Sequence, residues 1–239
     1  MGSDRFALWI GLAVGLALAL YTGCHLHSNK FPICGDLPAS SPVIVSFELS
    51  RSIDDLGQIF GPRVHTVGEA CERPAVNKLI HRLDTRNRAD ERIIIPLYVV
   101  FLFSFFLGMR GLDLRLSWTG AVVAVLAGVA DCVEDVCLGH LSHDYHLPSL
   151  WLALLPWATS VKWMALGVTG LLGGFIFAKR GGWRVLLAEL AAVIFAATIA
   201  AVFDRALAPY LAVALLTSWP ALIAMMICEI RWPQSARST

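Results

Sequence analysis

The sequence predicts an all-α integral membrane protein with about six transmembrane helices and a small mixed extracytoplasmic domain between the first two. Of its 239 residues, 57% are hydrophobic and 15% are charged, whereas soluble domains carry about 25% charged residues. Uncharged apolar runs long enough to cross a bilayer recur along the chain. None of them alternates like a barrel strand. The net charge of +1 and the lack of a basic block exclude nucleic acid as a partner and leave the lipid bilayer.

Residues 1–23 are expected to form an N-terminal anchor helix. Arg5 precedes an uncharged run from Phe6 to Tyr21. The length of this run is close to the minimum of ~17 residues that is needed to cross the hydrocarbon. Two forms of processing remain open. Residues 17–19 (Ala-Leu-Ala) resemble a signal-peptide cleavage site. The segment ending in Cys24 is reminiscent of a lipoprotein signal, in which that cysteine would be lipidated.

Residues 24–91 form the polar block in which we expect the small extracytoplasmic domain. Apolar and other residues alternate from Val43 to Leu49, which predicts a short, half-covered strand. Ser52, with Asp55 three residues later, predicts the capped start of a helix that ends at Gly61-Pro62. Pro74 opens a second helix whose apolar face consists of Val76, Leu79, Ile80 and Leu83. Such a domain offers a surface for a protein partner.

The cysteines of this block can form a disulfide if it faces an oxidising compartment. Cys24, Cys34 and Cys71 all fall here, and the simplest pairing is Cys24 with Cys34. One cysteine then remains free.

Residues 92–230 are expected to form a bundle of five membrane helices, followed by a cytoplasmic tail at 231–239. The first of the five should begin at a cap formed by residues 87–90 (Asn-Arg-Ala-Asp). The predicted helices cover Ile93 to about Met109, Leu116–Leu138, Leu150–Ala178, Val185–Phe203 and Pro209–Cys228.

Basic residues in the connections predict the orientation. Cytoplasmic loops carry an excess of Lys and Arg, and with six spans the basic connections fall on one side. Their basic residues are Arg110, Arg115, Lys179, Arg180, Arg184, Arg231 and Arg237. We therefore expect a multi-pass protein of the cell inner membrane with both termini in the cytoplasm.

The helix at 116–138 carries three acidic residues, Asp131, Glu134 and Asp135, where a bilayer should surround them. At about 100° per residue these acids share one face with three small residues, because i, i+3 and i+4 positions stack. The small residues are Gly120, Ala124 and Gly128. Small residues mark the side of a membrane helix that packs on other helices. The acids should therefore point into the bundle.

Lys162, on the next predicted helix, is the expected partner of these acids. The two helices are antiparallel around a turn near His146, and Asp131 and Lys162 lie about equally far from it. An isolated charge in a membrane costs roughly 2.5–3.5 kcal/mol, so the two should pair. One lysine cannot neutralise three acids, which leaves a carboxyl that can exchange a proton or bind a cation.

Two functional interpretations follow from this buried charged site. In the first, the protein carries out proton- or cation-linked membrane transport. In the second, it is a structural or assembly protein in which the acid–lysine pair only holds the bundle together. An enzyme is the least supported class, because the sequence has no nucleophile–base pattern, phosphate loop or Gly-x-Ser-x-Gly elbow.

A third interpretation, metal binding, rests on the turn that follows the acidic helix. His140, His143, Asp144 and His146 offer nitrogen and oxygen ligands suited to zinc, copper or iron. The spacing matches no known finger or protease motif. A transition metal is thus the cofactor that these residues suggest, and the sequence requires no other.

Several short motifs in this order resemble a group of uncharacterised bacterial multi-pass membrane proteins. They are Phe-Glu-Leu-Ser at 47–50, Asp90 with Ile-Pro-Leu-Tyr at 95–98, Asp131-x-x-Glu134-Asp135, and Lys162. That group has an Asp-x-x-Glu-Asn segment on one helix and a lysine on the next, so Asp135 stands where the group has Asn. The resemblance covers about the middle half of the chain and implies a membrane architecture, with no established activity.

Overall fold

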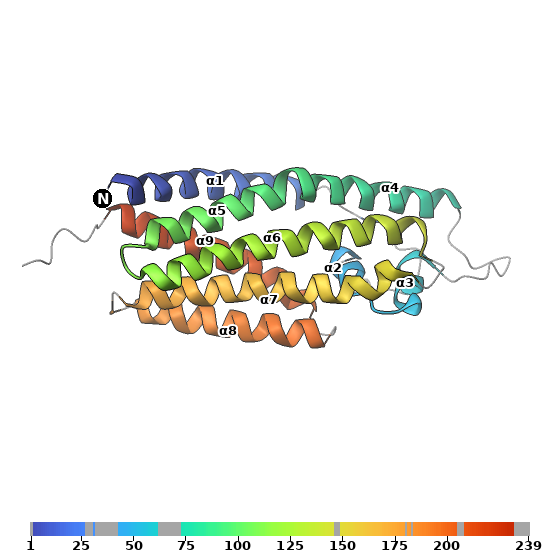
Figure 1. The fold of residues 1–239 in the computed structure, drawn as a ribbon. Coiled ribbons are helices and arrows are strands. Elements are labelled where there is room, and N and C mark those ends of the chain that lie inside the picture. Colours follow the sequence, from blue (N-terminus) through green and yellow to red (C-terminus); the bar gives the residue numbers. More distant parts are fainter. Residues whose placement is uncertain are drawn as a thin grey trace, which may run out of the picture.

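The computed structural model describes residues 2–26, 31, 43–61, 73–145, 149–179, 181–182, 184–204 and 208–231. Every regular element within these ranges is a helix, and the long helices lie side by side as a bundle (Figure 1). Three described segments are long and apolar enough to cross a membrane: Asp4–Thr22, Ala75–Met109 and Leu150–Ala178. The all-helical architecture with apolar candidate spans is therefore confirmed.

Six long helices build the bundle, and neighbours in sequence are neighbours in space. α5 packs on both α1 and α6, α7 packs between α6 and α8, and α9 packs on α8 and returns to α1. Each of the six overlaps a helix predicted from the apolar runs. Their bounds are α1 Gly2–Leu26, α5 Ile95–Met109, α6 Leu114–His143, α7 Leu150–Ala178, α8 Arg184–Phe203 and α9 Ala208–Arg231.

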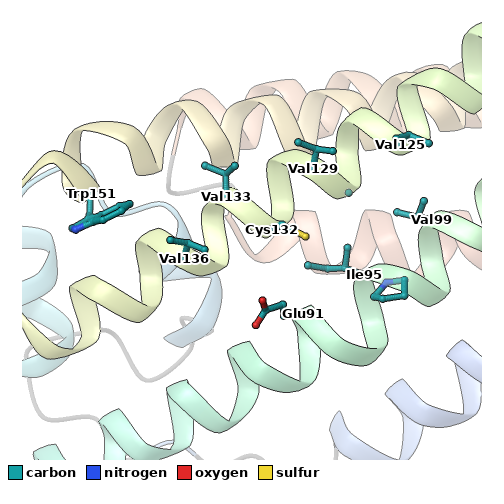
Figure 2. Close-up of a pocket in the computed structure, with 11 residues that line it drawn as sticks. Glu91, Ile95, Val99, Val125, Val129, Cys132, Val133, Val136 and Trp151 are labelled. Carbon is teal, nitrogen blue, oxygen red and sulfur yellow. The ribbon is translucent and has the colours of Figure 1, made fainter.

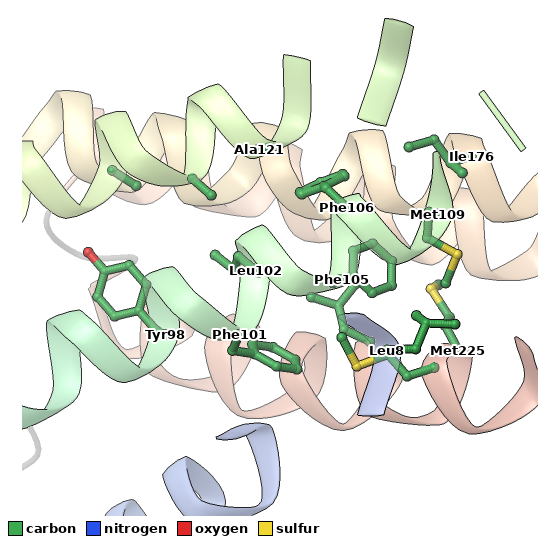
Figure 3. Packing of buried hydrophobic residues seen from close by; sticks show 14 of the residues in the cluster. Leu8, Tyr98, Phe101, Leu102, Phe105, Phe106, Met109, Ala121, Ile176 and Met225 are labelled. Carbon is green, nitrogen blue, oxygen red and sulfur yellow. The ribbon is translucent and has the colours of Figure 1, made fainter. Parts of the chain in front are cut away.

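The core between α1, α5, α6 and α9 is made of large side chains packed against small ones. Phe101, Phe105 and Phe106 of α5 are fully buried, and Figure 3 shows them surrounded by side chains from neighbouring helices. Opposite them α6 contributes alanines, among them Ala121. A ring can lie this close to the α6 backbone only because the facing residues are small.

The segment that was expected to be a strand is a short helix, α2 (Val43–Glu48). Its buried residues include Val43 and Phe47, which are four apart and therefore share one face of a helix. Positions i and i+4 also share one face of a strand, so this short alternating run fits both periods, and the strand prediction was wrong. No strand occurs in the ranges given above, so the mixed character of the outer domain is not shown.

Helix α3 (Ile53–Phe60) begins and ends as predicted. The Ser52 hydroxyl accepts a hydrogen bond from the Asp55 amide, and the Asp55 carboxylate accepts one from the Ser52 amide. Gly61 closes the helix with a φ of 96°, which glycine adopts readily. Leu56, Ile59 and Phe60 are buried against residues of α4, α6 and α7.

The predicted cap at residues 87–90 is wrong, because the chain is already helical there. Helix α4 (Arg73–Ala89) continues through a π-helical turn, η1 (Asp90–Ile94), directly into α5. Figure 1 shows α4 and α5 as one long rod. The expected boundary between residues 91 and 92 thus falls inside an unbroken helix.

Two ion pairs lie at the end of the bundle that carries the N-terminus. Arg110 contacts Asp4 at 2.5 Å, and Lys179 contacts Asp113. These pairs place the α5–α6 turn next to α1 and to the end of α7. Helices α2, α3 and α4 lie toward the opposite end (Figure 1).

Candidate functional site: a buried acid–lysine cluster

Lys162 lies on α7 with only 7% of its surface exposed, and three carboxylates surround its ammonium group. Nζ lies 2.9 Å from Asp131 Oδ1 and 3.6 Å from Glu48 Oε2, and it also donates a hydrogen bond to Glu134. The predicted pairing of Asp131 with Lys162 across α6 and α7 is therefore confirmed.

The acids of α6 face the bundle interior, as their alignment with small residues predicted. Glu134 is fully buried, and Asp131 and Asp135 are also buried, with exposed fractions of 7% and 9%. Gly120 on the same face packs so closely that a Cβ there would overlap the ring of Phe106. This face of α6 therefore packs against neighbouring helices.

Glu48 is a member of the cluster that the sequence did not suggest. It lies at the last position of α2, and α2 contacts both α6 and α7. The sequence predicts this segment in an extracytoplasmic domain, and so does not place Glu48 at the same depth as Lys162. The only signal for it was its place in the Phe-Glu-Leu-Ser motif.

Two hydroxyl groups complete the polar contacts, and neither was predicted as a site residue. The Tyr98 hydroxyl donates to Asp131 Oδ2 at 2.9 Å. Thr159 Oγ1 lies 3.0 Å from the backbone oxygen of Glu48 and also contacts Glu134 Oε1. Because a threonine hydroxyl has one hydrogen, it donates to one of these acceptors at a time.

The cluster holds more acid than base. Glu48, Asp131 and Glu134 contact Lys162, and Asp135 interacts electrostatically with Asp131 and Lys162. Within the described chain, Glu48 Oε2 and Asp135 Oδ2 are buried and make no hydrogen bond. A buried carboxylate without a hydrogen bond is costly, so such an oxygen favours a proton or a cation.

No family model, curated protein or solved structure matches this chain. The motif residues that are distant in sequence, from Glu48 through Asp131 to Lys162, lie together in one place.

The His-rich turn keeps its histidines in separate contacts. The His140 ring stacks on Trp151 at 4.2 Å between centroids, and His143 Nε2 lies 3.0 Å from Asp84 Oδ2. Asp144 follows the last turn of α6, and His146 lies outside the described residues. Among the described residues, no three His, Cys, Asp or Glu side chains gather as a metal site. Metal binding at this turn stays a prediction.

The disulfide prediction falls on parts of the chain that are not described. Cys34 and Cys71 lie outside the ranges given above, as does the side chain of Cys24. The pairing of Cys24 with Cys34 stays a prediction.

An apolar groove runs along the outside of the bundle between the η1–α5 segment and α6 (Figure 2). Its walls include Ile95, Val99, Val129 and Val136. Glu91 is the one ionisable carboxylate among the described residues that line it, and its side chain is exposed. This acid therefore lies on the outer side of α6, separate from the cluster around Lys162.

Proposed function

We propose that α1 and α5 to α9 span a membrane and that the Lys162 cluster transfers a proton or a small cation within the bundle. The supporting observation is the position of Lys162 among Glu48, Asp131 and Glu134, with Asp135 beside them. Buried acids that face a bundle interior commonly serve ion pathways and proton relays in membrane proteins.

The excess of carboxylates over lysine supplies the chemistry for this transfer. If all four carboxyls were ionised, one ammonium would leave a net charge of −3 inside the bundle. Burial opposes such a charge, so a proton or cation would bind. Lys162 keeps part of the cluster ionised, so that bound ions exchange rather than remain fixed.

Measurement of flux in proteoliposomes tests this proposal. The purified parent protein should move protons or a monovalent cation down an imposed gradient, and Asp131→Asn should reduce that flux about tenfold or more. Glu189→Gln is the matched control because Glu189 is an exposed acid on α8. Equal flux in the parent and in Asp131→Asn would remove the transport function.

We also propose that the end of the bundle that carries the Asp4–Arg110 and Asp113–Lys179 pairs faces the cytoplasm of a cell with an inner membrane. The short connections at this end carry basic residues, among them Arg110, Arg115 and Lys179, in agreement with the positive-inside rule. Accessibility of single cysteines introduced at residue 110 and at residue 81 in intact cells tests this orientation. We expect an external reagent to label the cysteine at residue 81 and to leave the cysteine at residue 110 unlabelled.

A structural role is the second candidate, because the same contacts connect three helices. Lys162 and Thr159 of α7 contact Glu48 of α2 and Glu134 of α6. A purely structural cluster should tolerate replacement of all its contacting charges together, by Lys162→Met with Glu48→Gln, Asp131→Asn and Glu134→Gln. Retained assembly and full cellular function in that variant would favour this role over transport.

A further inference from the structure

We infer that Asp90 is the group through which protons pass between the outer surface and the buried cluster. This inference rests on the proposed function and names both the transferred species and its path. It is carried by the π-helical turn that begins at Asp90, by the contacts of the Asp90 carboxylate, and by the buried, unpartnered oxygen of Asp135.

The π-helical turn places Asp90 on the face of the rod that faces the cluster. In a regular α-helix, residues eight apart differ by about 80° around the axis, so Asp90 and Tyr98 would diverge. A π turn accommodates one extra residue, so the two behave as i and i+7, about 20° apart. Tyr98 donates to Asp131, and Asp90 therefore faces the same interior.

The Asp90 carboxylate lies between the surface and the cluster. Its side chain is 18% exposed, and Oδ2 accepts a hydrogen bond from Arg86 at 3.1 Å. The other oxygen, Oδ1, is buried and makes no hydrogen bond within the ranges that the structure describes. Asp90 also interacts electrostatically with Asp131 and Lys162. One oxygen thus has a fixed partner near the surface, while the other is available for a proton.

Asp135 is the receiving group on the cluster side. It is nine-tenths buried, its Oδ2 makes no hydrogen bond in the described chain, and its electrostatic partners include Asp90, Asp131 and Lys162. In the transfer, the Asp90 carboxylate takes a proton from hydronium in the outer solvent, which leaves water, and passes it to the Asp135 carboxylate, which becomes a carboxylic acid. Asp90 then returns to its ionised form, so no other reactant is needed.

Glu91 provides a matched control for this path. It follows Asp90 in the same π-helical turn, but it borders the apolar groove on the outside of α6 (Figure 2). Replacing it removes the same charge from the same turn without touching the cluster. Only the residue that faces Asp131 should affect proton transfer.

The experiment compares proton flux in proteoliposomes for the parent and for single variants. Asp90→Asn is expected to lower flux about tenfold or more, Asp90→Glu to restore most of it, and Glu91→Gln to match the parent. Asp131→Asn is measured in parallel. Parent-level flux in Asp90→Asn, with flux lost in Asp131→Asn, would overturn the role of Asp90 and leave the proposed function standing. No proton flux in the parent above empty liposomes would overturn the role of Asp90, and the absence of monovalent-cation flux as well would overturn the proposed function.

Arg86→Gln gives a second test that keeps the Asp90 carboxylate in place. Arg86 is the basic partner of Asp90 at the surface. The charged groups on its inner side are Lys162, Asp131, Asp135 and Glu48. Loss of the guanidinium favours the protonated form of Asp90. The pH dependence of flux should therefore move to higher pH in this variant, and an unchanged profile would contradict the inference even if Asp90→Asn failed to fold.

Discussion

The Tyr98 hydroxyl donates a hydrogen bond to Asp131 Oδ2 at 2.9 Å, while Asp131 Oδ1 lies 2.9 Å from Lys162 Nζ. One carboxylate therefore connects α5, α6 and α7. The phenol also fixes the orientation of the carboxylate, because each oxygen has a different donor.

Tyr98→Phe should destabilise the folded protein by roughly 1.5–3 kcal/mol, because it removes a buried hydrogen bond to a charged group. The measurement is unfolding of the detergent-solubilised protein. A double-mutant cycle with Asp131→Asn provides the control, since the two effects should be strongly non-additive. Additive effects would show that the phenol and the carboxylate do not interact.

Lys162→Met should destabilise the protein by roughly 3–5 kcal/mol, because it leaves Glu48, Asp131 and Glu134 buried without their cation. Lys179→Met is the matched control because the Lys179 side chain is 49% exposed. Its effect should be much smaller. Comparable unfolding temperatures for the two variants would argue against a charged cluster at Lys162.

Gly120→Ala should destabilise the bundle by roughly 1–3 kcal/mol, because the added Cβ overlaps the Phe106 ring and forces it to move. Gly139→Ala, on the same helix, is the control, since no atom lies within 4 Å of a Cβ built there. Alanine at that position should be neutral or stabilise the helix by about 0.5–1 kcal/mol. Thermal unfolding in detergent ranks the two variants, and the reverse order would contradict the packing.

Asp113→Asn should lower the unfolding temperature near neutral pH but not in strong acid. The hydrogen bond from Lys179, with those from the Leu116 and Arg115 amides, holds the pKa of Asp113 below its usual value of 3.8. Its contribution to stability is therefore complete above 3.8 and is lost as the pH falls through the lowered pKa.

Asparagine can still accept the Leu116 amide, so this variant removes the charge and keeps the helix cap. Unfolding of the parent and the variant is followed across pH in detergent. A difference that persists unchanged in strong acid would show that the Lys179 ion pair is not its source.

The long helices could be predicted well because their signals are local. The bounds of α7 follow from the apolar run between Leu150 and Ala178, and α3 follows from its capping box. The inward face of α6 could also be predicted, since Gly120, Ala124 and Gly128 align with Asp131. Lys162 could be predicted as the partner of Asp131 because the two residues lie about equally far from the turn between α6 and α7.

The rest of the site depends on tertiary contacts that no local pattern encodes. Glu48 joins the cluster because α2 packs between α6 and α7, which a six-residue segment does not reveal. Tyr98 lies in a largely apolar run, and its hydrogen-bond partner Asp131 is 33 positions away, so its motif does not predict this contact. The π-helical turn at Asp90 was also not predicted, because a cap and a continuing helix begin with similar polar residues.

The unbroken helix from α4 through η1 into α5 has a mechanical consequence. The apolar candidate span within it covers 35 residues, or about 50 Å at ~1.5 Å per residue, whereas the hydrocarbon layer is about 30 Å thick. In the proposed membrane arrangement, part of this continuous helix therefore projects from the bilayer. A displacement of the projecting α4 segment would be transmitted through the helix to Asp90, because no flexible loop lies between them.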